Sequence, residues 1–214
     1  MENIILNNYS LRKFKGWIAV ALLCAALSSL ACAENNRPKW LSLDRDLWQH
    51  PDQVVQSLGI QPGDRVADVG SGEGYFTFRL SKAVGKNGKV YAVDIDEDRN
   101  QYVAKKAREE GYKNIEIIMP KVHDPLLPES GVDMIFTSNT YHHLEDRTHY
   151  FLNAKKYLRP NGRVVVIDFR KGAFRHFTEK RVVLEELRAA GYKLENDHAF
   201  LPKQNFLVFS APSK

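Results

Sequence analysis

The stretch VADVGSGEGYF, residues 66–76, is the part of the sequence whose residue types point most directly to chemistry. Asp68 stands two residues before a turn that has glycine at every second position, namely Gly70, Gly72 and Gly74. Glycines allow a positive φ and remove the Cβ atoms that would keep a ligand away from the backbone. The turn therefore predicts close contact between the main chain and a bound ligand.

The acid before this turn separates two classes of nucleotide ligand. A dinucleotide-binding turn has its third glycine one residue later, where this chain has Tyr75. Asp68 would also repel a pyrophosphate seated at the start of the next helix. It would attract a ligand with positive charge and no phosphate, such as S-adenosylmethionine with its ammonium and sulfonium groups. The sequence contains no GxxxxGK[ST] phosphate-binding loop.

A second polar group follows a later apolar run. Tyr141, His142 and His143 come after VDMIFTSN. Three roles are open for them: a polar wall facing a substrate, packing or plain surface, and a metal site, which two adjacent residues of one loop seldom provide alone. Basic residues after the next strand either line the path of an acidic substrate or form a solvated loop, the simpler interpretation: Arg170, Lys171, Arg175 and His176.

The elements that must position these groups alternate along the chain. Apolar residues at helical spacing predict helices, and short apolar runs predict buried strands. The expected helices cover residues 51–58, 74–84, 97–110, 148–158 and 179–190. The expected strands cover residues 65–69, 89–94, 115–119, 132–139 and 162–169. Two of these strands have similar sequences, NGKVYAVD and NGRVVVID. We interpret the similarity as the same local pattern used twice to end a helix and begin a buried strand.

The end of the chain breaks the alternation. The strand-like runs YKLENDHAF and QNFLVFS are separated by only three residues, which is too short for a parallel crossover, so they should pair antiparallel. The whole pattern predicts an α/β fold with a single doubly wound, mostly parallel seven-stranded sheet of the Rossmann-like type and a C-terminal antiparallel hairpin. Ligands of such sheets bind at the carboxyl ends of the strands, where Asp68 and the histidines stand.

Residues 54–169 resemble the class I S-adenosylmethionine-dependent methyltransferases, and the closing hairpin fits the seventh, antiparallel strand of that family. VADVGSGEGYF resembles the family's first motif, VDMIFTSNTYHHLED the motif at the end of the fourth strand, and LRPNGRVVVIDF the segment that enters the fifth. The likeness is to small-molecule enzymes of the quinone-biosynthesis type. It implies S-adenosyl-L-methionine as cofactor and a small molecule as methyl acceptor.

The resemblance also implies residue roles. Asp94 would accept from the ribose hydroxyls, since one carboxylate can serve both oxygens of a cis-diol; its alternative role is to cap the next helix. Asp124 is a late match for the acid that the family places after its third strand, and the proline-containing loop there leaves little room for the usual helix. The expected cofactor-binding residues are Asp68, Gly70, Ser71, Gly72, Gly74, Tyr75, Asp94, Ile95, Asp124 and Asn139.

Methyl transfer is an in-line displacement at a carbon already activated by sulfonium, so alignment and desolvation are the enzyme's main contributions. A general base is needed only where the acceptor must lose a proton early, as a hydroxyl does. His142 and His143 are the candidate catalytic residues, and Tyr141 and His142 the candidate substrate contacts. We expect no bound metal.

The N-terminal residues have the layout of a secretory signal peptide. Basic residues precede an apolar run over residues 16–27, and Ala31-Cys32-Ala33 offers a cleavage site before Glu34. Lipid attachment at Cys32, or an anchor formed by residues 16–33, are the alternatives. Both cysteines of the chain lie in this leader, so cleavage after Ala33 would leave no thiol in the mature protein.

The expected organisation is a signal peptide over residues 1–33, a helical lead-in over 34–60 and a methyltransferase domain over 61–214, exported to the periplasm. A length of 214 residues suits one domain, and the scattered basic residues indicate no nucleic-acid partner. Membrane contact is expected only through the leader or a lipid. Two other functions stay open: an exported binding protein without catalysis, since the cofactor is made in the cytosol, and a dinucleotide-dependent oxidoreductase, which Asp68 and Tyr75 disfavour.

Overall fold

A computed structural model of the chain describes residues 44–211. The predicted signal peptide and the first part of the predicted lead-in lie outside the described residues. From Asp46 onward the chain forms one compact unit, so the second part of the lead-in packs with the predicted domain. Within residues 44–211, none of the helices has both the length and the apolar composition needed to cross a membrane.

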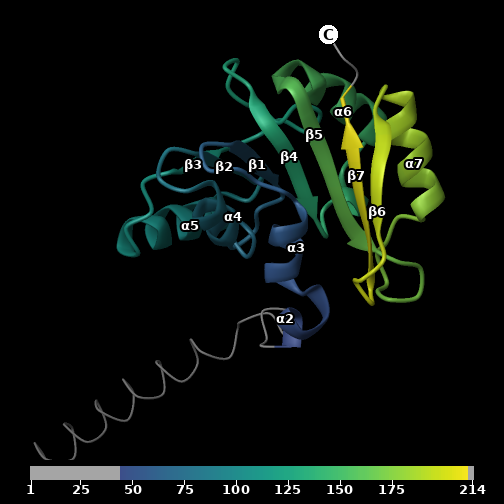
Figure 1. Cartoon of the computed structure of the whole chain (residues 1–214), viewed down its shortest axis with the longest axis horizontal. Helices are drawn as coiled ribbons and strands as arrows, with labels where there is room; N and C mark the ends of the chain where they lie inside the picture. The colour runs from purple at the N-terminus through teal and green to yellow at the C-terminus, as the bar shows by residue number, and fades with distance from the viewer. Residues whose placement is uncertain (1–43, 212–214) are drawn as a thin grey trace, which may run out of the picture. The chain divides into compact units, whose positions relative to one another are not determined.

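Seven strands form one sheet with the order β3-β2-β1-β4-β5-β7-β6 (Figure 1). Neighbouring strands run parallel except β7, which is antiparallel to both β5 and β6. This confirms the predicted mostly parallel sheet and its terminal hairpin. The strands are β1 (Arg65–Val69), β2 (Lys89–Val93), β3 (Ile115–Ile118), β4 (Val132–Ser138), β5 (Leu158–Phe169), β6 (Lys193–His198) and β7 (Gln204–Ser210).

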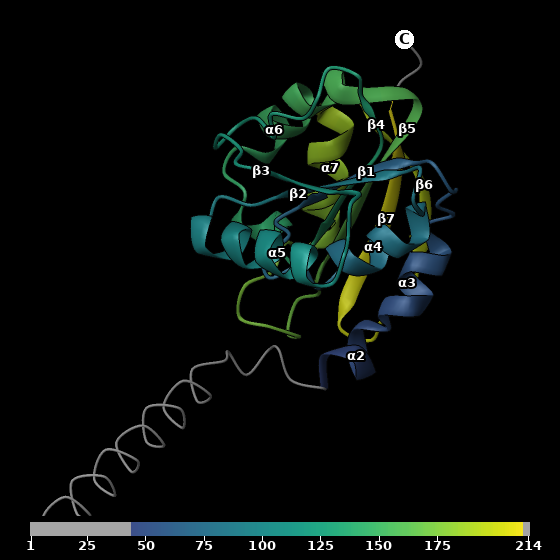
Figure 2. The same ribbon diagram turned by 90° about the vertical axis from the view of Figure 1, so that its left-hand side faces the viewer.

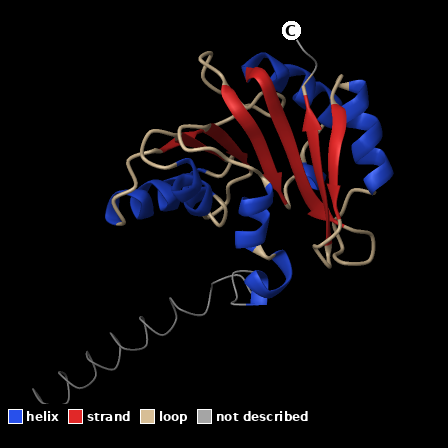
Figure 3. Cartoon of the chain, in the orientation of Figure 1, coloured by secondary structure: helices blue, strands red, loops and turns tan. Residues whose placement is uncertain are grey.

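Helices cover both faces of the sheet (Figures 1 and 2). Helices α3, α4 and α5 lie on one face, and α6 and α7 lie on the other, so the red strands in Figure 3 form a middle layer. The helical segments are α2 (Asp44–Gln49), α3 (Pro51–Ser57), α4 (Thr77–Val84), α5 (Glu97–Glu109), η2 (Tyr141–His143), α6 (Arg147–Ala154), η3 (Lys155–Tyr157) and α7 (Lys180–Ala189).

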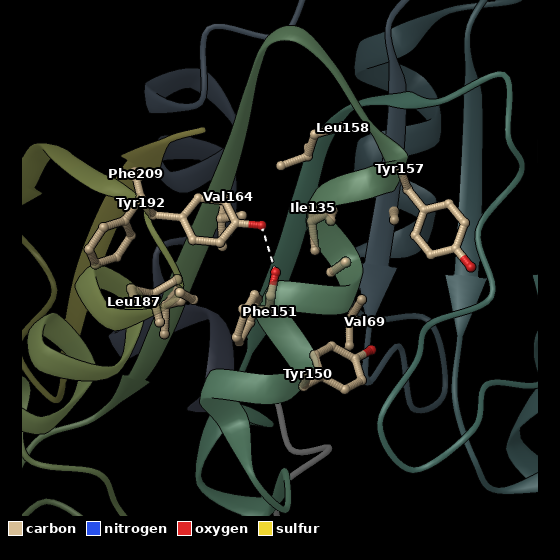
Figure 4. Close-up of a cluster of buried hydrophobic side chains, with 14 of the residues drawn as sticks. Val69, Ile135, Tyr150, Phe151, Tyr157, Leu158, Val164, Leu187, Tyr192 and Phe209 are labelled. Carbon is tan, nitrogen blue, oxygen red and sulfur yellow. Dashed lines mark hydrogen bonds between the residues drawn. The ribbon is translucent and has the colours of Figure 1, made fainter. Parts of the chain in front are cut away.

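Two hydrophobic clusters fix the helices to the sheet. One joins α6 and α7 to inward-facing strand residues such as Ile135 and Val164, and Figure 4 shows its aromatic members. There the hydroxyl of Tyr192 donates to the carbonyl oxygen of Phe151 at 3.0 Å. The second cluster joins α3 and α4 to the opposite face. Successive strand residues therefore pack into the two clusters in turn, and this packing on both faces holds the strand ends in fixed positions.

Two of the differences from the predicted element boundaries have a clear local cause. Helix α4 begins at Thr77 rather than at residue 74, because Gly74 has φ 82° and cannot start a right-handed helix. Strand β5 begins at Leu158, which was expected to end a helix. Leu158 pairs with Val132, and the residues between Leu158 and Arg163 form a bulge before regular pairing resumes. Pro160 disfavours continued helix at this point.

The connection between β3 and β4 contains no helix over residues 119–131, as the proline-containing loop predicted. Leu127 from this loop is 4% exposed and packs into the cluster on the α6 side of the sheet. A loop with one apolar anchor thus covers the sheet face that a helix would otherwise cover.

Candidate functional site

The candidate site lies where the strand order changes direction. The chain passes from β1 outward through β2 to β3, then returns to β4 beside β1 and proceeds outward through β5 on the other side. In open α/β sheets, ligands bind at such a point, where the connections that leave the carboxyl ends of neighbouring strands diverge. The predicted site residues other than Asp124 lie at the carboxyl ends of β1, β2 and β4 or in the turns that follow them.

The glycine turn after β1 has the conformation that its composition predicted. Gly70, Gly72 and Gly74 have φ values of 75°, 55° and 82°. The amides of Gly70 and Ser71 donate to the carbonyl oxygen of Val93 at 2.7 and 3.2 Å. The left-handed backbone is therefore held against the end of β2, and a side chain at these positions would be strained.

Asp68 is buried at the end of β1, with 3% of its surface exposed. Its Oδ2 accepts a hydrogen bond from the hydroxyl of Thr77, the first residue of α4, at 2.7 Å. Thr77 was not among the predicted site residues. The pair connects the end of the strand to the start of the helix across the glycine turn, and it places a buried negative charge beneath the turn.

Asp94 connects the end of β2 to the same turn. Its Oδ2 accepts from the amide of Gly72 at 2.8 Å, and its Oδ1 accepts from the amide of Asp96 at 3.0 Å. The helix-capping role considered for Asp94 belongs to Asp96, whose side chain accepts from the amide of Arg99 at the start of α5. Each carboxylate oxygen of Asp94 has a second lone pair that a ligand hydroxyl could use.

Several features of this turn fit S-adenosylmethionine. No atom lies within 4 Å of the position that a Cβ on Gly72 would occupy, so the backbone is open on that side. Ser71 Oγ is buried and has no hydrogen-bond partner within residues 44–211. Ile95 is 74% exposed beside Asp94 and offers an apolar surface for a flat base. Tyr75, also predicted, donates to Asp46 Oδ1 of α2 at 2.5 Å.

The turn after β4 packs directly against the glycine turn. A Cβ built on Gly70 would lie 2.1 Å from Thr140 Oγ1 and 2.5 Å from Thr140 Cβ, so no residue but glycine fits. The next residue back, Asn139, has φ 57°, and its Oδ1 accepts from Gln204 Nε2 of β7 at 2.5 Å. The structure thus brings Asn139 next to the predicted cofactor turn.

His142 is paired with an acid that sequence reasoning missed. Its Nδ1 lies 2.6 Å from Asp168 Oδ1 near the end of β5, with side-chain exposures of 4% and 1%. Asp168 Oδ2 is buried, and no group in the described part of the chain donates to it. The sequence did contain a clue to this role. Asp168 ends NGRVVVID just as Asp94 ends NGKVYAVD, but the two similar segments were interpreted only as two buried strands that begin alike.

His143 and His176 surround this pair. The ring centroid of His143 is 4.1 Å from that of His142, and the ring of His176 lies 6.2 Å from His142 and nearly parallel to it. His143 keeps an exposed edge, yet partial burial and the nearby imidazoles of His142 and His176 lower its pKa. Residues 44–211 hold no set of three or more His, Cys, Asp or Glu arranged to hold a metal ion.

Tyr141 does not face the site, which corrects its predicted role as a substrate contact. Its side chain is fully buried and its ring stacks on Phe151 of α6 at 5.7 Å. Its hydroxyl donates to Glu186 of α7 at 2.7 Å, and burial together with that carboxylate raises the pKa of Tyr141. Tyr141 therefore packs into the core, whereas the next residue, His142, contacts Asp168 near the end of β5.

In the structure, three groups of the protein itself bind the carboxylate of Asp124. Lys156 Nζ, the Tyr157 hydroxyl and the Leu126 amide all donate to its carboxylate at 2.7–2.9 Å. Burial acts to raise the pKa of Asp124, but these donors outweigh it and lower the pKa. Its partners lie in its own loop and in η3, before β5, so Asp124 is not brought together with the residues around the glycine turn.

Helix α2, from the predicted lead-in, contributes contacts that the sequence did not reveal. Asp46 accepts from Tyr75 and also from Arg79 of α4 at 3.1 Å. Gln49 is fully buried and donates to Ser138 at the end of β4 at 2.7 Å. Trp48 packs against Phe169 at the end of β5, with ring centroids 5.7 Å apart. Residues 46–49 therefore touch both the glycine turn and the β4–β5 edge.

Comparison with protein families agrees with this geometry. A family model described as a methyltransferase domain matches residues 60–201. The ubiquinone/menaquinone biosynthesis C-methyltransferase UbiE of Vibrio vulnificus is 29% identical over 122 residues, which are 56% of this chain and 47% of that protein. The corresponding protein of Hahella chejuensis is 27% identical over 119 residues, 55% of this chain and 48% of that protein. The chain spans about half the length of these curated relatives.

Solved structures with the same arrangement include a SAM dependent methyltransferase from Aquifex aeolicus. Its TM-score is 0.75 at 26% identity, covering 80% of this chain and 94% of that one. The magnesium protoporphyrin IX methyltransferase of Synechocystis PCC 6803, solved with bound SAM, has a TM-score of 0.63 at 18% identity and covers 83% and 86%. The second likeness concerns the fold alone.

Proposed function

The chain belongs to the methyltransferase-domain family and has the S-adenosylmethionine-dependent methyltransferase fold, and from that premise we propose that the whole protein methylates a small molecule held at the ends of β4 and β5. S-adenosylmethionine supplies an electrophilic methyl group when it is bound. The chain's own residues hold that cofactor, orient the acceptor and exclude water.

The observation that carries the proposal is the construction of the glycine turn. Two buried carboxylates, Asp68 and Asp94, flank a backbone whose Gly72 is open on its outer side. Asp68 favours the ammonium of the cofactor's methionine part, and Asp94 offers lone pairs to the ribose hydroxyls. A pyrophosphate would meet the negative charge of Asp68 at this place, which opposes a dinucleotide.

The acceptor side is built from the turn after β4. His142 and His143 stand at the strand ends beside the glycine turn, and we assign His142 as the residue that takes a proton from the acceptor where one must leave. The lowered pKa of His143 favours its neutral form, which suits a wall of the acceptor site. Asn139 orders the turn that carries them.

The named activity of the UbiE relatives is carbon methylation in quinone biosynthesis. Because the chain matches about half the length of those proteins, we carry over the transfer chemistry and leave the acceptor to this chain's own residues.

Calorimetric titration of the purified chain with S-adenosylmethionine, S-adenosylhomocysteine and NAD tests the cofactor assignment. We expect both adenosyl compounds to bind and NAD not to bind. Release of S-adenosylhomocysteine in the presence of acceptors then distinguishes an enzyme from a binding protein. Binding of NAD without binding of S-adenosylmethionine would refute the proposal.

We also propose that the chain is exported with cleavage after Ala33, on the strength of its leader sequence. Mass spectrometry of the protein from fractionated cells should find a terminus at Glu34 outside the cytosol. An intact Met1 terminus in the cytosolic fraction would contradict export, and a lipid mass on Cys32 would replace cleavage with anchoring.

A further inference from the structure

His142 and Asp168 form a buried pair, and a polar wall of the acceptor site would not need a buried carboxylate. Asp168 is 1% exposed and presents one oxygen to His142, while its other oxygen has no donor in the described part of the chain. A buried carboxylate with an unsatisfied oxygen is costly and contributes little to stability. Such groups are retained where their charge has a use.

The contact fixes the state of the imidazole. A carboxylate accepts only, so Nδ1 of His142 must donate the hydrogen bond of 2.6 Å, and Nε2 is left as the acceptor. When Nε2 takes a proton, the negative charge of Asp168 stabilises the resulting cation. A histidine held in this way acts as a general base, and Asp168 acts through it as a positioning residue.

The surroundings of the pair are aromatic. Phe169 lies 6.2 Å from the His142 ring, and Phe174 stacks on Phe169 at 4.8 Å. The ring centroid of Trp48 lies 5.7 Å from that of Phe169, and the ring of His176 lies nearly parallel to that of His142. Phe174 is 48% exposed although it is a large apolar side chain. Flat rings in offset or edge contact with such side chains gain energy beyond that of buried area.

We propose that Asp168 and His142 form a proton-accepting pair, and that the acceptor of this protein is therefore an aromatic hydroxyl compound of the phenol class, methylated on oxygen. The inference rests on the proposed methyltransferase function. A phenolic hydroxyl titrates near 10 in water, as tyrosine does, which is within reach of an imidazole base. Aliphatic alcohols are much weaker acids, and neutral amines attack through a lone pair and need no early deprotonation.

The acceptor oxygen forms a bond to the methyl carbon, and the carbon–sulfur bond breaks with its electron pair returning to sulfur. The hydroxyl proton moves to Nε2 of His142 and later leaves to solvent. The products are an aryl methyl ether, S-adenosylhomocysteine and one proton.

Nitrocatechol is a suitable probe because its phenol and phenolate absorb at different wavelengths. With the full chain and S-adenosylhomocysteine, we expect bound nitrocatechol to be ionised at a pH at which it is mostly protonated in water. His142→Gln and Asp168→Asn should lose this ionisation while keeping the affinity for S-adenosylmethionine within twofold. Asp197→Asn on β6 is the matched carboxylate-to-amide control and should behave like the parent protein.

Turnover provides the second measurement. General-base removal by His142→Gln should lower methylation of nitrocatechol by about 10²–10⁴-fold. Asp168→Asn should lower it by at least about tenfold and move the acidic limb of the pH–rate profile to lower pH, because loss of the carboxylate disfavours a protonated imidazole. The rings of His143 and His176 contact that of His142, and Arg99 acts on the pKa of His143, so His176→Gln is measured alongside.

The outcomes separate the two proposals. Failure to bind S-adenosylmethionine would refute the methyltransferase function itself. Binding of S-adenosylmethionine with unchanged turnover and an unchanged pH profile in both pair variants would make the pair a purely structural contact and overturn this inference. Methylation of an aniline or a thiol in preference to the phenol, or of no aromatic hydroxyl at all, would overturn the acceptor class and leave the function standing. Circular dichroism of each variant confirms folding.

Discussion

The two proposed halves of the site, a cofactor half and an acceptor half, are built in different ways. The cofactor half uses residues 68–75 and one acid at the end of the neighbouring strand, so it is nearly continuous in sequence. The acceptor half assembles His142, Asp168 and His176 with residues 46–49, which come from four separate places in the chain. A contiguous backbone cradle leaves a motif in the sequence, whereas a side-chain cluster gathered by the fold does not.

The electrostatics differ as well. In the cofactor half both acids accept hydrogen bonds from the chain itself, Asp68 from Thr77 and Asp94 from two backbone amides. In the acceptor half Asp168 keeps one buried oxygen to which no group of residues 44–211 donates. The hydrogen bonds to Asp68 and Asp94 preorganise a binding surface, whereas the charge of Asp168 can stabilise His142 when that histidine gains a proton.

The largest effect is expected where the two halves touch. Gly70→Ala should destabilise the fold by about 1–2 kcal/mol through its left-handed backbone, and by roughly 1–3 kcal/mol more because its Cβ would overlap Thr140. Gly111→Ala is the matched control, since Gly111 has the same φ of 75° and nothing within 4 Å of its Cβ position. Urea unfolding of both variants measures the difference, and equal losses would show that the turns do not interlock.

The next effect concerns the cofactor half alone. Asp94→Ala should weaken S-adenosylmethionine binding by roughly 1.5–3 kcal/mol, the range for hydrogen bonds to a charged group. Asp96→Ala removes the cap of α5 and should cost about 1 kcal/mol of stability with little change in affinity. Titration calorimetry compares the two, and parental affinity in Asp94→Ala would remove this residue from the cofactor site.

A smaller effect is expected for Tyr141→Phe. The variant loses the hydrogen bond to Glu186, which Arg147 also holds, so stability should fall by about 0.5–1.5 kcal/mol. The KM for the acceptor should not change, because the buried hydroxyl cannot reach it. Tyr192→Phe, which loses a comparable buried bond to Phe151, serves as control. A raised KM in Tyr141→Phe would return this residue to the acceptor site.

The smallest effect tests the residue that neither half uses. The pKa of Asp124 is lowered in the folded chain, so its ionised form contributes stability above the ordinary carboxyl pKa, and this is lost as the pH falls through the folded value. Asp124→Asn should cost roughly 1 kcal/mol near neutral pH, with the difference from the parent vanishing in acid. Thermal unfolding between neutral and acid pH measures this. Weaker cofactor binding in the variant would instead support the prediction that Asp124 is a cofactor-binding residue.

Periodicity and turn residues predicted the sheet and its reversed strand, because each depends on local pattern or on the short link between β6 and β7. The glycine turn and Asp94 were predicted for the same reason. The role of Asp168 was not predictable, since strand pattern already explained an aspartate at that position. Tyr141 was misplaced because alternation within a three-residue 3-10 turn is not encoded in the pattern around it.

The contact between Gly70 and Thr140 has a consequence for recombination. The turn after β4 fits against the turn after β1 only because Gly70 has no side chain. The two turns must therefore come from the same parent protein, although about seventy residues separate them in the sequence. A chimera with a crossover between β1 and β4 would join turns that were never matched, whereas a crossover in the segment between β5 and α7 keeps the matched turns from one parent. Acceptor preference is therefore best transplanted by exchanging that later segment, with the paired turns left intact.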